Sequence, residues 1–179
     1  MNRHHRKSIR LKEYDYSQPG EYFVTICTHK KECIFGAVVD EEMQLSTAGE
    51  IIKEEWMRTA SIRSDVELDV FAIMPNHIHG IIILNENDNG RGTSQRDPTR
   101  EQFGKPTSNS IPTIVRLIKS VTTKQINQMR NTPGIPVWQR GYYEHIIRNE
   151  TELDNIRDYI LNNPVKRFYE KENSFGDSP

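Results

Sequence analysis

Phe-Ala-Ile-Met-Pro-Asn-His-Ile-His-Gly-Ile-Ile-Ile-Leu, residues 71–84, is the segment around which the rest of this chain is predicted to be arranged. It consists of two apolar runs separated by Pro75 and Asn76, which are turn-forming residues. The stretch therefore predicts an antiparallel hairpin whose second strand begins near His77. Because successive side chains of a strand point to opposite faces, His77 and His79 share one face of the predicted sheet.

The pair His77 and His79 has two interpretations. Two imidazoles about 7 Å apart along a strand can converge on one metal ion, since each metal–nitrogen bond spans about 2 Å. The same pattern is typical of two partly buried histidines that hydrogen-bond to neighbouring groups. Both interpretations stay open on this stretch alone.

Length and composition predict one domain over residues 1–179. The net charge of −1 neither indicates nor excludes a nucleic-acid partner, because the local distribution of charge matters more than its sum. No apolar run approaches the roughly 20 residues of a membrane span, and no signal-type apolar core follows the basic N-terminus. We therefore expect a cytoplasmic protein without a membrane partner. The two cysteines are too few for a disulfide framework or a thiolate zinc site.

The N-terminal third predicts a basic arm, two strands and a helix. Residues 1–20 are polar and basic, and either fray in solvent or contact phosphates. Residues 22–28 predict the first strand, and residues 33–39 predict its hairpin partner. The spacing of Thr47 and Glu50 is typical of a capping box, so it predicts a helix that begins there and ends near Ala60.

Residues 85–110 are rich in Asn, Gly, Asp, Ser, Thr and Pro, and they predict a polar, mobile insert that is either a lid or a tolerated insertion. Pro112 opens a second helix, whose predicted core side consists of Ile114, Leu117, Ile118, Val121 and Gln125. Its opposite side carries Arg116, Lys119, Thr123, Asn127 and Arg130. Such a stripe is usually a solvated face. The absence of carboxylates from residue 111 to residue 130 favours a phosphate-contacting surface.

The last part of the chain predicts a strand and a third helix. The second half of residues 137–148 predicts the strand. Asn149 can cap the helix that follows, with Glu152 three positions later and Pro164 ending it. Leu153, Ile156 and Ile160 supply its apolar side. Tyr159 and Asn163 stand four residues apart, so we expect them on one face of this helix.

The predicted order of elements is strand, helix, two strands, helix and strand, followed by one more helix. This is a split βαβ, ferredoxin-like α+β fold. We expect an antiparallel sheet with helices on one face and a C-terminal helix that carries Tyr159. The chain has no glycine-rich phosphate loop and no Gly-x-Ser-x-Gly elbow.

A metal ion on two histidines keeps open positions and acts as a Lewis acid towards a phosphodiester. A tyrosine nucleophile then suits transesterification, because a phosphotyrosine keeps the energy of the phosphodiester bond. Tyr159 is the preferred candidate, and Tyr142 and Tyr143 are its rivals because they lie near Arg140 and His145. An ordinary packing role for Tyr159 stays open at this point.

An ordered set of motifs carries a resemblance to a known family. Residues 74–80, Met-Pro-Asn-His-Ile-His-Gly, resemble the His-hydrophobic-His signature of the single-tyrosine HUH transposases. From about Ser8 to Lys166 the chain resembles their branch of REP-associated tyrosine transposases (RAYT). The other motifs are Arg10-Leu11 with Tyr14-Asp15-Tyr16, Tyr22-Phe23-Val24-Thr25, Trp138-Gln139-Arg140, Glu144-His145-Ile146-Ile147-Arg148, Tyr159-Ile160 and Asn163-Pro164-Val165-Lys166.

The resemblance implies a metal-dependent enzyme that cleaves single-stranded DNA, often at hairpins of palindromic repeats, and transfers the strand. It implies Tyr159 as the nucleophile that forms a 5′-phosphotyrosine. It implies His77 and His79 as ligands of Mg²⁺ or Mn²⁺, with Asn163 in the place of a third ligand. We expect a monomer or a homodimer.

For contacts to the DNA backbone we expect Arg116, Lys119, Lys124, Arg140, Arg148 and Lys166. Trp138 or Tyr142 is a candidate for stacking an unpaired base, although core packing is the expected use of Trp138. Two alternatives remain: a nucleic-acid-binding ferredoxin-like module without catalysis, and a metal-dependent hydrolase that forms no covalent adduct with DNA.

Overall fold

The computed structural model describes residues 14–86 and 110–164. Most of the predicted basic arm, most of the polar insert and Lys166 lie outside the described residues. The elements follow in the order β1 (Gly20–Cys27), the 3₁₀ turn η1 (His29–Lys31), β2 (Gly36–Val39), β3 (Glu42–Leu45), α1 (Thr47–Ser61), β4 (Val66–Met74), β5 (His77–Leu84), α2 (Ile111–Arg130), β6 (Tyr143–Ile147) and α3 (Glu150–Leu161).

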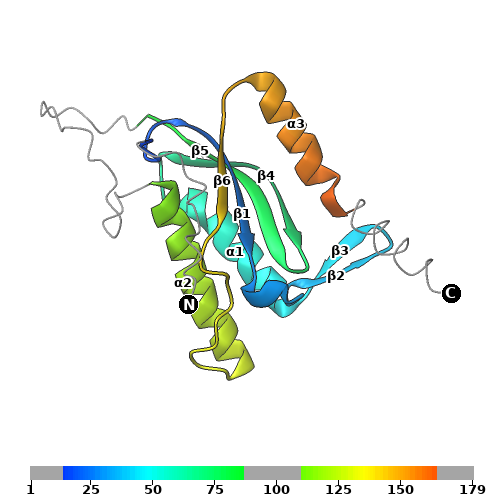
Figure 1. Cartoon of the computed structure of the whole chain (residues 1–179). Coiled ribbons are helices and arrows are strands. Elements are labelled where there is room, and N and C mark those ends of the chain that lie inside the picture. The colour runs from blue at the N-terminus through cyan, green and yellow to red at the C-terminus, as the bar shows by residue number, and fades with distance from the viewer. Residues whose placement is uncertain (1–13, 87–109, 165–179) are drawn as a thin grey trace, which may run out of the picture.

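Four of the strands form one antiparallel sheet in the order β4-β5-β1-β6 (Figure 1). The chain enters at β1, crosses through α1 to the β4–β5 hairpin, and returns through α2 to β6 at the edge beside β1. This is the split βαβ arrangement that the order of elements predicts, so the predicted fold class is confirmed. The single domain, the cytoplasmic location and the monomer or homodimer stay predictions.

The central hairpin forms at the predicted turn. Met74 pairs with His77 across it, and Pro75 and Asn76 make the connection. The backbone carbonyls of both turn residues accept hydrogen bonds from neighbouring loops, Pro75 from Phe35 N at 3.0 Å and Asn76 from Thr28 N at 2.9 Å. The turn is therefore fixed by tertiary contacts as well as by its own residues.

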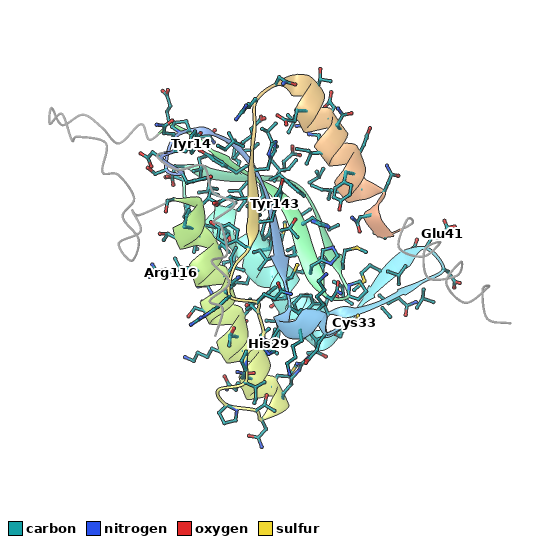
Figure 2. All side chains as sticks on the ribbon, in the orientation of Figure 1. Tyr14, His29, Cys33, Glu41, Arg116 and Tyr143 are labelled. Carbon is teal, nitrogen blue, oxygen red and sulfur yellow. The ribbon has the colours of Figure 1, made fainter. Side chains whose placement is uncertain are left out.

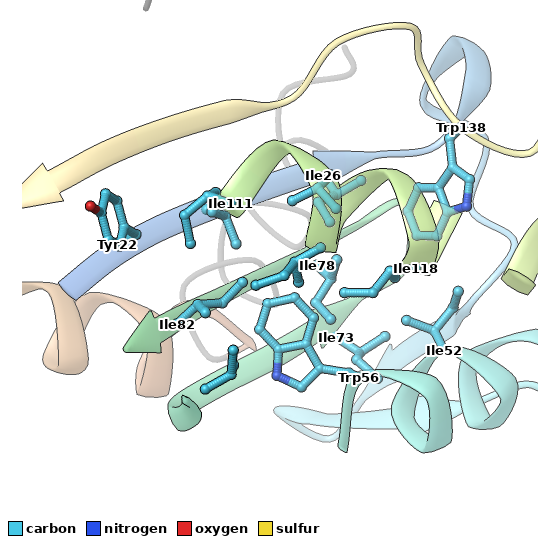
Figure 3. Packing of buried hydrophobic residues seen from close by; sticks show 14 of the residues in the cluster. Tyr22, Ile26, Ile52, Trp56, Ile73, Ile78, Ile82, Ile111, Ile118 and Trp138 are labelled. Carbon is cyan, nitrogen blue, oxygen red and sulfur yellow. The ribbon is translucent and has the colours of Figure 1, made fainter. Parts of the chain in front are cut away.

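The larger core lies between α1, α2 and one face of the sheet (Figure 3). Tyr22, Ile26, Ile78 and Ile82 point into it from the strands, and Trp56 fills its centre from α1 with no exposed surface. The opposite face carries a smaller cluster under α3, which consists of Phe23, Ile81, Ile147, Leu153 and Ile160. Both faces of the central strands are thus covered, and α3 is the one helix on its side among the described residues.

The structure corrects two predictions near the N-terminus. Residues 33–39 do not pair with β1, because β1 lies inside the sheet with β5 and β6 on its two sides. Residues 36–39 instead form β2, which pairs with β3 in a separate hairpin. The cap of α1 is Ser46 rather than Thr47, since the Ser46 side chain accepts a hydrogen bond from Gly49 N at 3.2 Å.

The predicted core side of α2 was only partly right. Ile114 and Ile118 are buried, but Leu117 is 39% exposed and Gln125 is exposed. Thr122 and Asn127 are buried in place of apolar residues. Their side chains bond to the segment that follows α2: Thr122 Oγ1 accepts from Trp138 Nε1 at 3.0 Å, and Asn127 Nδ2 donates to Ile135 O at 2.8 Å. The buried side of α2 is therefore turned towards the loop that returns to β6.

Within the described residues, the longest helix is too polar to cross a membrane, and no other helix meets the length and apolarity of a span.

We expect Gly80→Ala to destabilise the fold by about 2 kcal/mol or more, because overpacking of a filled core displaces its side chains. A Cβ atom at Gly80 would lie 2.3 Å from Trp56 Cζ2 and 3.0 Å from Phe71 Cβ. The control is Gly141→Ala, where no atom lies within 4 Å of the added Cβ. Urea unfolding measures both free energies, and equal values for the two variants would contradict this account of the core.

Candidate active site

His77 and His79 lie side by side on β5 and point to the face of the sheet that α3 covers. Ile78 between them is fully buried in the core on the opposite face. The Nε2 atoms of the two histidines are 2.7 Å apart, and their ring planes stand at 76° to each other. Two ring nitrogens at this distance cannot both present bare lone pairs, so a proton or a metal ion has to lie between them.

The outer ring nitrogens of both histidines are held by neighbouring side chains. His77 Nδ1 donates to Asn76 Oδ1 at 2.7 Å. The orientation of the Asn76 amide is fixed by its Nδ2, which donates to Lys31 O at 3.3 Å. His79 Nδ1 and Thr25 Oγ1 are 2.8 Å apart. Partners of this kind set the ring orientation of metal-binding histidines, and they leave Nε2 of each ring facing the shared point.

The surroundings of His79 favour its neutral form. His79 is 5% exposed, and the Phe23 ring stacks on the His79 ring with the two centroids 5.7 Å apart. Burial, and to a smaller extent the neighbouring His77, lowers the pKa of His79 to about 3. At neutral pH the ring therefore carries no positive charge of its own and can offer a lone pair.

Tyr159 reaches the histidine pair from α3, 80 residues further along the chain. Its ring meets the His79 ring edge-on with centroids 5.3 Å apart, and it meets Phe23 at 6.2 Å. The residue is 42% exposed, so one side of the phenol faces outward. The helix begins as predicted, because the Asn149 side chain accepts from Glu152 N at 2.9 Å.

Asn163 also lies at the histidine pair, although α3 ends two residues before it, at Leu161. Tyr159 and Asn163 thus reach the same histidine from one side, as expected, and the role of Asn163 as a ligand stays a prediction. Asn163 Nδ2 is 3.4 Å from His79 Nε2, and a half-turn of the amide about Cβ–Cγ exchanges Nδ2 for Oδ1 at this place.

Two imidazoles and one amide are a donor set that fits a divalent ion with open coordination positions. In residues 14–86 and 110–164, no group of three or more His, Cys, Asp and Glu side chains forms a metal site. The amide of Asn163 lies at the pair, and its role as a third ligand stays a prediction.

An ion pair holds α3 against the sheet. Arg157 Nε donates to Asp69 Oδ2 at 2.8 Å, and the Asp69 carboxylate raises the pKa of the guanidinium. Asp69 lies in the irregularity between Leu68 and Phe71, where the register of β4 against β5 shifts. Bulges of this kind turn side chains away from their regular direction. This bulge gives α3 its charged anchor on β4.

The other tyrosines in the described residues are placed differently. Tyr16 and Tyr22 are buried at the start of β1, and burial raises the pKa of Tyr22, which disfavours its phenolate. Tyr142 points to the α2 side, and its hydroxyl donates to Glu144 Oε2 at 2.6 Å. Tyr143 lies on the same face as the histidines and is 41% exposed. Of the two rivals of Tyr159, only Tyr143 therefore shares its face of the sheet.

The structure divides the predicted basic contacts into separate groups. Arg140 and Arg148 are exposed at the two ends of β6. Arg116 and Lys124 are exposed on α2, which covers the opposite face of the sheet from His77 (Figure 2 labels Arg116 there). The predicted stripe on α2 is thus not continuous with the histidine pair.

Lys119 is occupied by the protein itself. Its ammonium group donates to Gln139 O at 2.9 Å and to Gly141 O at 2.7 Å, and burial lowers its pKa to about 8. Trp138 is 7% exposed in the core, and Tyr142 packs against the same core. The core packing expected for Trp138 is therefore confirmed, while base stacking by Tyr142 stays a prediction.

Sequence reasoning missed three residues of the site. Thr25 and Phe23 were seen only as strand formers, and Asn76 only as a turn former. Their contacts with His77 and His79 depend on the pairing of β1 with β5 and on the fold of the turn. A signal was present for Phe23 and Thr25, because they alternate with the core residues Tyr22, Val24 and Ile26, but it does not indicate which strand is the neighbour.

Comparison with known proteins gives relatives in sequence and in fold. The chain is 43% identical over 163 residues to an uncharacterized protein of Haemophilus influenzae, a match that covers 90% of this chain and 89% of the relative. It is 33% identical over 104 residues to a protein of the same organism that is provisionally described as a REP-associated tyrosine transposase; this match covers 58% of the chain and 52% of that relative. No family model matches the chain.

A solved structure of a REP-associated tyrosine transposase bound to a REP hairpin has a similar fold, with a TM-score of 0.57 at 20% identity. The similarity covers 89% of this chain and 74% of the other. The resemblance to these transposases that the motifs indicate is thereby confirmed in sequence and in fold.

We expect the buried, neutral His79 to make the metal-free protein sensitive to acid. Its pKa is about 3 when folded and 6.5 when unfolded, so only the unfolded chain takes up the proton between these values. The free energy of unfolding is therefore highest above pH 6.5 and falls as pH is lowered towards 3. At pH 5 the loss is about 2 kcal/mol. Urea unfolding at pH 7 and pH 5, with chelator present, measures this loss. His79→Gln, which cannot titrate, should lose less, and an equal loss in both proteins would contradict the assignment.

We expect Asp69→Asn to loosen α3 without unfolding the sheet, because it removes the charged anchor on β4. The control is Asp154→Asn, which removes one of the two partners of Arg157 within α3, 3.1 Å away, and leaves Glu150 at 3.8 Å. Hydrogen exchange followed by mass spectrometry should show the amides of α3 exchanging several-fold faster in Asp69→Asn than in the control. Equal exchange in the two variants would mean that Asp69 does not hold the helix.

Proposed function

Because the chain belongs to one family with the uncharacterized Haemophilus influenzae protein and resembles REP-associated tyrosine transposases in sequence and fold, we propose that it is a single-tyrosine HUH transposase. Its activity is metal-dependent cleavage and strand transfer of single-stranded DNA through a 5′-phosphotyrosine on Tyr159. The observation that carries the proposal is the edge-on contact of Tyr159 with His79, whose Nε2 converges with that of His77.

In the cleavage step the hydroxyl oxygen of Tyr159 attacks the phosphorus of a phosphodiester. The Oη–P bond forms, the bond from phosphorus to the 3′ oxygen breaks, the phenol proton passes to water, and the departing oxygen takes up a proton as a 3′-hydroxyl. Strand transfer is the reverse reaction with the 3′-hydroxyl of another strand. The bond energy is conserved in both directions, so no nucleotide cofactor is consumed.

His77, His79 and Asn163 would hold a divalent ion, Mg²⁺ or Mn²⁺, which supplies stabilisation of the negative charge on the phosphoryl oxygens. Asn76 and Thr25 orient the two imidazoles from behind. Burial keeps the His79 ring neutral at the pH at which its lone pair is needed.

Phe23 positions the nucleophile. Its side chain is 8% exposed and contacts both the His79 ring and the Tyr159 ring. A rigid apolar side chain that packs against both rings restricts their relative orientation before substrate binds, and such preorganisation lowers the entropic cost of reaching the transition state.

The substrate is proposed from chemistry and from the solved relative. Arg140 and Arg148 place positive charge at both ends of the edge strand β6, which suits a phosphate backbone that passes over the face with the histidines. The solved relative is bound to a REP hairpin. We therefore infer that single-stranded DNA with a hairpin of palindromic repeats is the substrate class.

The proposal predicts a denaturation-resistant protein–DNA adduct when the protein is incubated with Mn²⁺ and labelled single-stranded hairpin DNA from the repeats that flank its gene. Denaturing electrophoresis detects the adduct. Tyr159→Phe should abolish it, His77→Ala should lower its rate at least 100-fold, and chelator should have the same effect as His77→Ala.

Two further variants make the test specific. Tyr143→Phe lacks the rival hydroxyl and should still form the adduct, and Tyr14→Phe is the control for loss of a phenol remote from the site. An adduct that survives in Tyr159→Phe but not in Tyr143→Phe would move the nucleophile to β6. Hairpin binding without any adduct would favour the non-catalytic binding module, and DNA hydrolysis without an adduct would favour the metal-dependent hydrolase.

A further inference from the structure

An exposed aromatic ring lies on the edge strand β6, in line with the histidine pair. Tyr143 pairs with Thr25, and Thr25 pairs with His79, so the three residues form one row across the sheet on the same face. Two strand spacings separate the ends of this row, roughly 10 Å between Cα atoms. Tyr143 is therefore close to the proposed site of cleavage, and it is 41% exposed.

The Tyr143 ring packs against Phe23 and keeps a substantial exposed surface. Phe23 meets it at 68° with centroids 6.1 Å apart, and the same Phe23 meets Tyr159 at 86° and 6.2 Å. One buried phenylalanine thus fixes both tyrosine rings (Figure 2 labels Tyr143 beside β6). A held ring with a free surface costs little conformational entropy when a ligand packs on it.

The adjacent Tyr142 shows the contrast. Its hydroxyl donates to Glu144 Oε2, and the Lys119 ammonium lies 5.8 Å from its ring centroid on the α2 side of the sheet. The protein's own groups therefore engage Tyr142, while Tyr143 keeps an exposed ring on the face with the histidines. The neighbouring positions give a matched pair of tyrosines with opposite surroundings.

The charges along β6 match a nucleic-acid strand. Exposed Arg140 and Arg148 lie before and after the strand. Between them, His145 Nε2 is 2.7 Å from Glu152 Oε1 on α3. Glu144 is buried on the opposite face. The nearby Glu152 carboxylate is engaged by His145 and by Arg148 N at 2.8 Å. An exposed aromatic ring between two cationic groups is the usual composition of a site that binds single-stranded nucleic acid.

We propose that Tyr143 is a stacking platform for an unpaired base of single-stranded DNA next to the scissile phosphate. This inference rests on the proposed function, since it takes DNA as the substrate, and it assigns Tyr143 to binding rather than to bond breaking. Arg140 and Arg148 bind the DNA backbone on either side of this base. The position of the stacked base determines which phosphate lies next to Tyr159.

The test separates binding from chemistry by using the full chain with Tyr159→Phe as the parent protein. Hairpin DNA that carries 2-aminopurine at one position at a time around the cleavage site reports stacking through quenching of its fluorescence. Adding Tyr143→Leu should abolish quenching at one position and weaken binding by roughly 5- to 150-fold, the range for loss of one base–aromatic stack. With Tyr143→Phe in place of Tyr143→Leu, both the quenching and the affinity should match those of the parent protein, because phenylalanine keeps the aromatic ring.

Two readouts exclude a merely structural effect. The dependence of affinity on salt should keep its slope in Tyr143→Leu, since no phosphate contact is lost, whereas Arg140→Ala should lower the slope. Tyr142→Leu is the matched control and should leave the quenched position unchanged, even where it lowers stability. Unaltered quenching and affinity in Tyr143→Leu, or a loss of equal size in Tyr143→Phe, would overturn the proposal.

Adduct formation and DNA binding together distinguish a wrong assignment of Tyr143 from a wrong proposed function. If the wild type forms the adduct and Tyr143→Leu binds DNA like its parent, the platform is refuted and the transposase chemistry stands. If no adduct forms but Tyr143-dependent quenching persists, the chemistry is refuted and the platform stands.

Discussion

The alternation of side chains along β5 is the constraint on which the rest of this structure depends. Ile78 and Ile82 point into the core beneath α1 and α2, so the register of β5 is fixed by the burial of apolar surface. The same alternation forces His77 and His79 to the opposite face. A slip of one residue would turn both histidines into the larger core and move the isoleucines to the face under α3. The fold therefore cannot form without bringing the two imidazoles together on the other side.

The position of Tyr159 beside the histidine pair depends on how α3 packs against the sheet. The cluster under α3 is small compared with the main core, and an ion pair between Arg157 and Asp69 adds a fixed point on β4. Partly buried charged pairs contribute geometry as much as stability. Phe23 connects the parts of this face, because it lies against His79, Tyr143 and Tyr159. A single apolar side chain on β1 thus sets the relative positions of the histidine pair and both exposed tyrosines.

Positive charge is arranged around the edge of the sheet rather than along one helix. Lys119 links α2 to the loop before β6 through two backbone carbonyls, and Arg140 lies between these two carbonyls in sequence. A lysine that looks like a phosphate contact in the sequence is therefore used to position a segment that carries another cation. The outer residues Arg116 and Lys124 face away from the histidines. Any contacts of Arg116 and Lys124 with DNA would therefore lie away from the proposed site of cleavage.

The sequence by itself determined the elements whose signals are local. The Pro75-Asn76 turn and the shared face of His77 and His79 follow from strand periodicity, and the start of α3 follows from the Asn149 cap. Short-range chemistry also decided the fold class, because the order of strands and helices leaves few antiparallel topologies.

Only the tertiary structure decided which strands are neighbours, and therefore which side chains surround the histidines. Thr25 meets His79 across 54 residues of sequence, and Asn163 meets it across 84. Residues 33–39 were predicted to pair with β1, but β1 has β5 and β6 as neighbours, which local propensity cannot indicate. Propensity and periodicity describe one segment at a time, whereas pairing depends on the burial of both partners at once. The histidine pair could be found in the sequence, but its surroundings exist only in the folded chain.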